Sequence, residues 1–421
     1  MESKMSIKSF LSGGVLFSFL LIFATCKDTE ENNILKVAIN AGPEGEALKT
    51  LAPQYDKMRI QVIELPYATL REQLITALGE NRPTFDVVMI DDPWFPQLAP
   101  QLTTLVNIPD SLINDLVPAT VRLCRIPYGN GDLRALPLVG NTQLLFYRND
   151  ILLKYGVKNV PTDWSGVAKI AKDVSARRVS TAGPRVYGYA IRGRAGAPIV
   201  TDFLPIYWSL GGRLVDDVGN PSSGAVDGRI LAQSLKIYRE LKDASPPGAA
   251  NYDWSEMTSA FTNGFATMQL NWPAAIPVID SAILSQTGHR GWSVAMPPGM
   301  VGRPGTSMIG NWLVSVPKSS KHQKEAEEFI VWVMEQQERV ASAGNPPTRI
   351  SVLDKLAKKP GSEYFGVIRE ALENSTPRVR SEHWAQIEDA VSRCVSGFLS
   401  GQLQEDDAIR LLTAEIDRVF K

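Results

Sequence analysis

The opening of the chain alternates between short β-branched runs and longer segments with apolar residues at helical spacing. The short runs predict three strands, at residues 34–40, 60–65 and 85–90. The segments between them predict two helices, at residues 46–57 and 69–78. Strand–helix–strand repetition indicates a parallel sheet with helices packed against it, which is an α/β fold. Ligands of such sheets bind beyond the carboxyl ends of the strands.

The rest of the chain continues as a mixture of predicted helices and strands. Further strands are expected at residues 188–191, 266–270, 292–296 and 308–316. Helices are expected at residues 151–155, from about 163 with Thr162 or Asp163 as the cap, 203–210, 230–242, 257–261, 325–338, 351–357, 365–372, 384–399 and 406–420. The Pro- and Gly-rich stretches have the composition of loops and not of domain linkers. The pattern therefore favours two interleaved lobes over two separate domains.

The first residues have the organisation of a secretory signal. Lys4 and Lys8 precede an apolar run at residues 10–23, which is followed by Ala24, Thr25 and Cys26. Fourteen residues are too few for a spanning helix, which needs about 20. An uncleaved anchor is the alternative.

The position of Cys26 sharpens this interpretation. Residues 23–26 (FATC) are similar to the bacterial lipobox, in which the cysteine becomes the first mature residue and carries lipid, although Phe23 and Thr25 depart from its usual residues. Residues 27–33 have no apolar face and would form a polar tether. We therefore expect a signal peptide at 1–25, a tether at 26–33 and lipidation of Cys26, with plain secretion as the alternative.

Composition excludes several functional classes. The 421 residues contain 44 Lys and Arg against 45 Asp and Glu, so no basic excess points to nucleic acid. Three His and three Cys make a multi-ligand metal site or a disulfide framework improbable, and we expect neither metal nor cofactor. Cys124 and Cys394 could pair in an oxidising compartment, but two separate buried thiols are the favoured interpretation.

Catalytic motifs are missing from the sequence. It contains no G-x-S-x-G, Walker A, H-E-x-x-H or C-x-x-C pattern. Asp91 and Asp92 could suggest a glycosidase, but adjacent residues of an extended segment point in opposite directions and cannot flank one bond by themselves. We therefore expect no enzyme, and keep a secreted glycosidase as the alternative function.

Binding chemistry is present instead. Several of the nine Trp lie beside loop-forming or hydrogen-bonding residues, at Asp92-Pro93-Trp94, Asn271-Trp272-Pro273, Gly310-Asn311-Trp312 and His383-Trp384. Sugars offer apolar C–H faces and a rim of hydroxyl groups, so their sites combine flat aromatic rings with polar hydrogen-bonding groups. Trp164, Trp254 and Trp332 fit better as core residues.

Six segments in order carry a family resemblance. They are residues 85–99, 135–152, 209–217, 261–272, 310–332 and 384–416. Together they resemble the extracellular solute-binding proteins of ABC importers, in the sugar-binding group related to maltose-binding protein. Asn311 departs from the pattern, since Gly-Gly-Trp is commoner there.

The resemblance implies a two-lobed periplasmic-binding-protein fold with a ligand cleft between lobes joined by crossover strands. Lobe one would comprise residues 34–139 and 293–345, and lobe two residues 140–292 and 346–421. The ligand-binding residues carried over are Glu44, Asp91, Asp92, Trp94, Asn141, Asp202, Trp272, Trp312, Arg349 and Trp384.

The resemblance also implies a mechanism. A sugar or oligosaccharide would favour closure because both lobes contact it only when closed. The protein would be a monomer outside the cytoplasm, held to a membrane by its lipid, and its partner would be an ABC permease.

Overall fold

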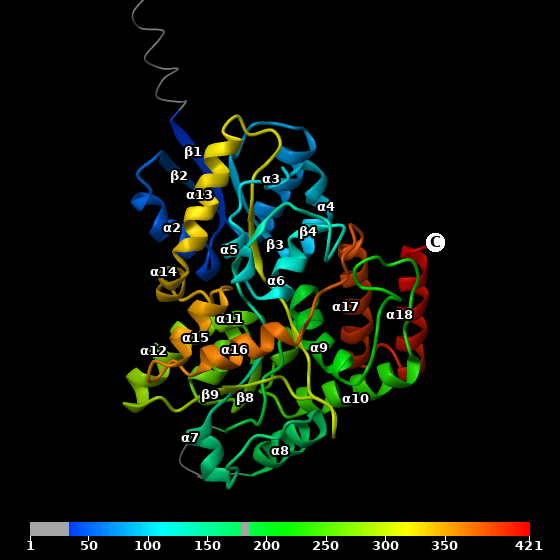
Figure 1. Cartoon of the computed structure of the whole chain (residues 1–421). Helices are drawn as coiled ribbons and strands as arrows, with labels where there is room; N and C mark the ends of the chain where they lie inside the picture. The colour runs from blue at the N-terminus through cyan, green and yellow to red at the C-terminus, as the bar shows by residue number, and fades with distance from the viewer. Residues whose placement is uncertain (1–32, 178–184) are drawn as a thin grey trace, which may run out of the picture.

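The computed structural model describes residues 33–177 and 185–421. Two α/β lobes lie one above the other in Figure 1. The upper lobe combines the blue and cyan N-terminal elements with the yellow helix α13, so segments far apart in sequence share it. The expected signal peptide and the expected lipidation site Cys26 lie outside the described residues. No helix of the described part is long and apolar enough to cross a membrane.

Lobe one is built on a five-stranded sheet in the order β2-β1-β3-β11-β6. Its strands are β1 (Ile34–Asn40), β2 (Arg59–Leu65), β3 (Val87–Asp91), β6 (Leu136–Val139) and β11 (Trp312–Ser315). The predicted parallel arrangement is confirmed for β1, β2 and β3, whereas β11 runs antiparallel to both of its neighbours. Buried residues of these strands form one core with the surrounding helices. Those helices are α2 (Pro43–Leu51), α3 (Tyr67–Gly79), α4 (Phe95–Leu98), α5 (Asp110–Asn114), α13 (Gln323–Glu335) and α14 (Gln337–Ser342).

Lobe two contains a three-stranded sheet in the order β8-β7-β9. Its strands are β7 (Leu144–Tyr147), β8 (Met268–Asn271) and β9 (Ser293–Ala295). Two apolar cores lie around this sheet. The helices that form them are α6 (Pro118–Leu123), α7 (Asn149–Leu152), α8 (Trp164–Ala176), α9 (Ala197–Ser209), α10 (Gly228–Asp243), α11 (Trp254–Thr262), α12 (Ile276–Thr287), α15 (Ile350–Ala357), α16 (Tyr364–Glu373), α17 (Trp384–Ser400) and α18 (Glu405–Val419).

Short strands complete the fold near the lobe boundary. β10 (Ser307–Met308) pairs with β12 (Ser375–Thr376), and β4 (Arg125–Ile126) pairs with β5 (Asp132–Leu133). The strand predicted at 308–316 is therefore divided, because the chain passes between lobes at Gly310 and Asn311. β9 pairs with β7 and therefore belongs to the sheet of lobe two. This differs from the expectation that residues from 293 onward belong to lobe one.

Two further predictions differ from the structure. Residues 188–191 form no strand, since only an isolated bridge joins Tyr187 to Ala266 there. The helix expected at 325–338 is two helices, because the chain breaks at Gln336 between α13 and α14. Asp163 is the cap of α8, as expected, and its Oδ1 accepts from the backbone N–H of Gly166 at 2.9 Å.

The two described thiols lie apart. Cys124 and Cys394 are both free and buried, in the cores of different lobes. The expectation of two separate buried thiols is confirmed. Burial raises the pKa of the Cys394 thiol to about 12, which keeps it protonated at neutral pH.

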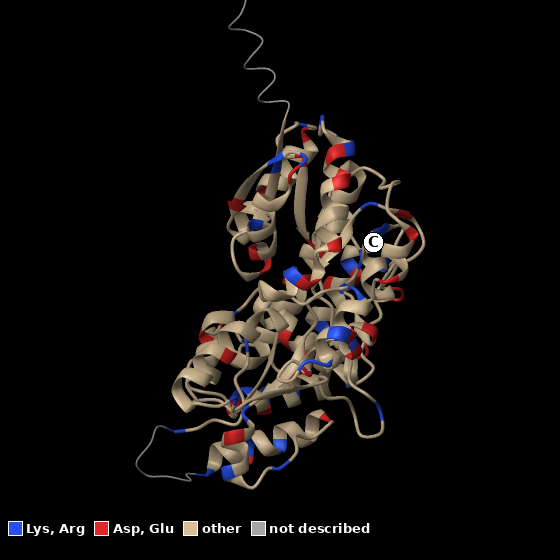
Figure 2. Cartoon of the chain, turned by 60° about the vertical axis from the view of Figure 1, so that its left-hand side comes forward, with Lys and Arg blue, Asp and Glu red and all other residues tan. Residues whose placement is uncertain are grey.

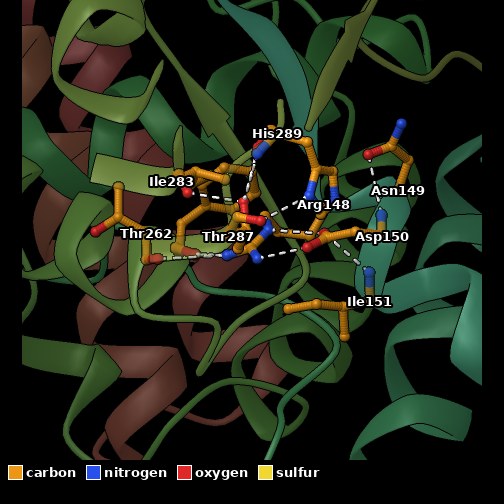
Figure 3. A network of polar contacts seen from close by, with 9 residues as sticks. Arg148, Asn149, Asp150, Ile151, Thr262, Ile283, Thr287 and His289 are labelled. Carbon is orange, nitrogen blue, oxygen red and sulfur yellow. Dashed lines mark hydrogen bonds and ion pairs between the residues drawn. The ribbon is translucent and has the colours of Figure 1, made fainter. Parts of the chain in front are cut away.

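A buried ion pair fixes the end of β7 in lobe two. The Arg148 guanidinium bonds both carboxylate oxygens of Asp150, at 2.9 and 2.8 Å, and donates to the carbonyls of Phe261 and Thr262 (Figure 3). Arg148 is 4% exposed, so this network is structural. Acidic and basic residues are interspersed along the ribbon of both lobes (Figure 2).

Candidate functional site

Two adjacent carboxylates lie at the carboxyl end of β3. Asp91 is the last residue of the strand, and Asp92 begins a 3-10 turn that ends at Trp94. The turn changes the backbone direction, and Arg378 Nη2 bonds Asp91 Oδ1 at 3.0 Å and Asp92 Oδ2 at 2.8 Å. The expectation that these side chains point in opposite directions is therefore wrong, since it assumed an extended segment.

Asp92 is enclosed by a second arginine. Arg380 Nη1 donates to the Asp92 backbone carbonyl at 2.8 Å and to Asp92 Oδ1 at 3.3 Å. Asp92 has no exposed surface, and burial raises its pKa while Arg378 and Arg380 oppose that effect. Both arginines lie between β12 and α17. They anchor lobe one to that segment and leave Asp92 no free surface for a ligand.

An aromatic cluster adjoins Asp91. The Tyr67 hydroxyl, at the start of α3, donates to Asp91 Oδ2 at 2.8 Å. The ring centroids of Trp94 and Trp312 lie 4.7 and 6.0 Å from that of Tyr67. Trp94 is 4% and Trp312 5% exposed, whereas Tyr67 is 43% exposed. Surrounding protein still desolvates the Tyr67 hydroxyl enough to raise its pKa well above the usual value, and the neighbouring Asp91 adds to this.

Helix α17 supplies a carboxylate from lobe two. Trp384, its first residue, is 4% exposed, and Glu388, one turn later in the helix, is half-buried. Burial raises the pKa of Glu388, and this carboxylate also interacts electrostatically with Asp91 and Arg71 of lobe one. Glu388 is therefore influenced by charges of both lobes, Arg378 of its own lobe and Asp91 of lobe one.

A further carboxylate of lobe one lies beside the end of β1. Glu44, in the first turn of α2, accepts from Asn40 Nδ2 at 3.4 Å and is half-buried. Burial raises the pKa of the Glu44 carboxyl. The negative charge of Asp91 raises this pKa further, and the positive charge of Arg192 in lobe two lowers it. Arg192 is held in turn by Asp253, through Nε at 2.7 Å.

The crossovers hold Asn141 and Trp272 near each other. The Asn141 carbonyl accepts from the backbone N–H of Gly310 at 2.9 Å. The Trp272 ring lies against Gly310, and it is half-buried. Gly310 thus joins an expected ligand residue on the first crossover to another at the end of β8.

Two expected site residues have internal partners instead. Asp202 is 1% exposed and accepts from the Arg192 backbone N–H and the Tyr238 hydroxyl, both at 3.0 Å. Arg349 pairs with Asp115 at 2.7 Å. Asp202 lies inside lobe two and Arg349 lies beside Asp115, so both differ from the cleft positions carried over from the resemblance.

Sequence reasoning missed the side chains that complete the cluster. The expectations from the sequence rested mainly on Trp and Asp residues beside loops. They therefore did not include Tyr67, Arg192, Arg378 and Glu388. Tyr67 begins the observed helix α3 two residues before the predicted helix, and the sheet-edge rule could have pointed to it because it follows the end of β2. Among residues 33–177 and 185–421, no group of three or more His, Cys, Asp or Glu could hold a metal ion.

Known proteins share this architecture. Residues 41–339 match the sequence profile of the family described as bacterial extracellular solute-binding protein. A probable ABC transporter-binding protein of Deinococcus radiodurans is 26% identical, with 81% of each chain covered. A mannitol-binding protein of Pseudomonas aeruginosa is 23% identical over 89% of each chain. A probable amino-acid ABC transporter periplasmic-binding protein of Sinorhizobium fredii is 23% identical, covering 78% of this chain and 76% of its own.

Solved structures agree with the fold. T. maritima MalE3 with maltose bound is 25% identical, with a TM-score of 0.79 over 92% of this chain and 99% of that chain. A ribitol complex of a solute-binding protein from Agrobacterium radiobacter, 22% identical, has a TM-score of 0.78 over 92% and 98%. The profile match spans most of the chain and the two-lobed architecture is the same. The chain therefore belongs to the bacterial extracellular solute-binding protein family.

Proposed function

We propose that this protein captures a neutral sugar or polyol between its lobes and delivers it to an ABC permease. The observation that carries the proposal is that polar groups of opposite lobes interact with one another. Arg378 of lobe two bonds Asp91 of lobe one at 3.0 Å, and the charges of Glu388 and Arg192 in lobe two act on the Tyr67 hydroxyl and the Glu44 carboxylate of lobe one. A ligand between them contacts both lobes only when they are closed, so binding favours closure.

The chemistry of these groups supports a polyhydroxylated ligand. Carboxylates of Glu44, Asp91 and Glu388 accept hydrogen bonds from hydroxyl groups, and the exposed face of Tyr67 suits a ring or chain of C–H groups. Trp94 and Trp312 support the Tyr67 ring from behind, because both pack against it and are nearly buried. Maltose in MalE3 and mannitol in the Pseudomonas relative's name belong to the same chemical class.

An amino acid is the second candidate ligand, because the Sinorhizobium relative carries that description. Its carboxylate would need an available cation. Arg378 is bonded to Asp91 and Asp92, Arg380 to Asp92, and Arg192 to Asp253. These three arginines are already neutralised, which favours the neutral ligand. Arg71 near Glu388, by contrast, has a buried Nε without a partner among the described residues and is the cation that an amino acid would use.

The remaining parts of the proposal come from the sequence. Lipid on Cys26, after removal of residues 1–25, would hold a monomer at a membrane outside the cytoplasm. The ligand would leave unchanged, since Asp91 and Asp92 are held by one guanidinium and are not disposed as a glycosidase pair.

A ligand screen tests the proposal. The melting temperature of the mature chain should rise with a neutral sugar or polyol by mass action, and the same compound should be recovered unchanged after long incubation. Cleavage products would favour the glycosidase alternative. A rise with amino acids alone would favour the second candidate.

A further inference from the structure

Four buried asparagines lie where the strands of lobe one end and the crossovers begin. Asn40 ends β1, Asn141 follows β6, Asn311 precedes β11, and Asn345 follows α14. Their exposed fractions are 5%, 2%, 0% and 1%. Each has a side-chain oxygen without a hydrogen-bond partner in the protein, and the Asn311 nitrogen is unpartnered too. Buried polar groups are almost always hydrogen-bonded, so these amides call for a partner from outside the chain.

Hydrogen bonds bring two of them beside the cleft carboxylate Glu44. Asn345 Nδ2 donates to the carbonyl of Pro43 at 2.9 Å. Asn40 Nδ2 donates to the Glu44 carboxylate at 3.4 Å. Asn40 and Asn345 thus hold consecutive residues at the start of α2, and each keeps its own oxygen free.

Backbone hydrogen bonds join the other two to this region. Gly140 N–H donates to the carbonyl of Pro346, next to Asn345, at 2.7 Å. The carbonyl of Asn141 accepts from Gly310 at 2.9 Å, and Gly310 precedes Asn311. All three crossovers are therefore connected, and the four asparagines belong to one polar region, which we call the amide floor (Asn40, Asn141, Asn311 and Asn345).

We propose that the amide floor is the deep end of the ligand site and that it binds hydroxyl groups of an uncharged ligand. This inference rests on the proposed function and narrows the ligand class. Four unpaired oxygens accept from hydroxyl donors, and the Asn311 amide can donate to one hydroxyl while accepting from the next. A carboxylate placed there would meet acceptors beside Glu44, which disfavours acidic ligands.

The floor also gives Asn311 a role that glycine cannot fill. It occupies the position where Gly-Gly-Trp is the commoner pattern, between the Trp272 contact at Gly310 and the aromatic cluster at Trp312. We infer that Asn311 is a specificity-determining residue.

Calorimetric titration tests the inference with D-mannitol, ribitol, D-tagatose and maltose as probes. Asn311→Leu and Asn345→Leu should each weaken binding at least tenfold, because they keep volume and remove the amide. Asn251→Leu, at an exposed amide, should leave affinity unchanged. If Asn311→Leu lowers the apo melting temperature, Asn311→Ser replaces it and should weaken binding several-fold.

The outcomes separate the two proposals. If the wild type binds a probe and the floor variants bind it equally well, the amides hold only water and the inference is wrong, while the proposed function stands. If the wild type binds none of these probes and binds an amino acid, the proposed function fails and the floor proposal fails with it.

Discussion

The indole of Trp272 lies against Gly310 so closely that a Cβ at residue 310 would come within 2.5 Å of the ring. This contact joins the end of β8 in lobe two to the crossover that leads into β11. A side chain at residue 310 would therefore displace the ring or the crossover.

Gly310→Ala is expected to weaken ligand binding and to destabilise the protein by about 1–3 kcal/mol through overpacking. Gly79→Ala is the matched control, because its added Cβ meets nothing within 4 Å. Calorimetry and thermal unfolding of both variants check this.

Trp272→Ala should weaken binding with a small change in apo melting temperature. A large fall in that temperature with unchanged affinity would place Trp272 in the core instead.

Tyr67→Ala is expected to weaken binding about 10- to 100-fold, since burying roughly 100 Å² of ring contributes about 2–3 kcal/mol before ordering costs. Its stability should fall by about 1–3 kcal/mol, because the variant loses the hydrogen bond to the buried Asp91 carboxylate. Tyr67→Phe keeps the ring, so its loss of ligand affinity should be smaller than that of Tyr67→Ala. Equal affinities of wild type and Tyr67→Ala would remove Tyr67 from the site.

Arg378→Met is expected to cost about 3–5 kcal/mol of stability, because it leaves the buried carboxylate of Asp92 short of a partner. Arg229→Met is the control, since the Arg229–Asp227 pair is exposed and contributes about 0–1 kcal/mol. Chemical denaturation measures both. Similar midpoints for the two variants would mean that Arg378 does not stabilise the lobe boundary.

The buried carboxyl of Asp202 should make the stability of the protein depend on pH. Burial raises its pKa from the usual 3.8 to about 6. The folded state then binds more protons than the unfolded state between these values, so this group's contribution to stability falls as pH rises from 3.8 to 6. The loss is about 3 kcal/mol.

Asp202→Asn removes that titration while keeping an acceptor for Tyr238. The free energy of unfolding of the variant should therefore rise relative to that of the wild type as pH rises from 3.8 to 6. This difference should persist above pH 6. Denaturation midpoints at pH 4 and pH 7 give the comparison, and parallel pH profiles of the two proteins would contradict it.

Cys26→Ser should move the protein from the membrane fraction to the soluble fraction, because the lipid would be lost. Mass spectrometry of the native protein should find no peptide from residues 1–25 and a heavy, modified Cys26. An unmodified Cys26 within an intact peptide would contradict lipidation.

The sequence was most informative where a local pattern decides the structure. β-branched runs located β1 and β3, and the sheet-edge rule placed Glu44 and Asp91 where those strands end. It could not reveal that Arg378 bonds Asp91, because 287 residues separate them. Nor could it show that Asp202 is enclosed by Tyr238, since burial of one carboxylate depends on packing between α9 and α10.

The central claim is that a neutral polyhydroxylated ligand binds between the lobes. Isothermal titration of the mature chain with D-mannitol, ribitol, D-tagatose, maltose and a set of amino acids tests it most directly. The account predicts saturable one-to-one binding of at least one neutral compound and none of the amino acids. Saturable binding of an amino acid, with no heat from any neutral compound, would contradict it.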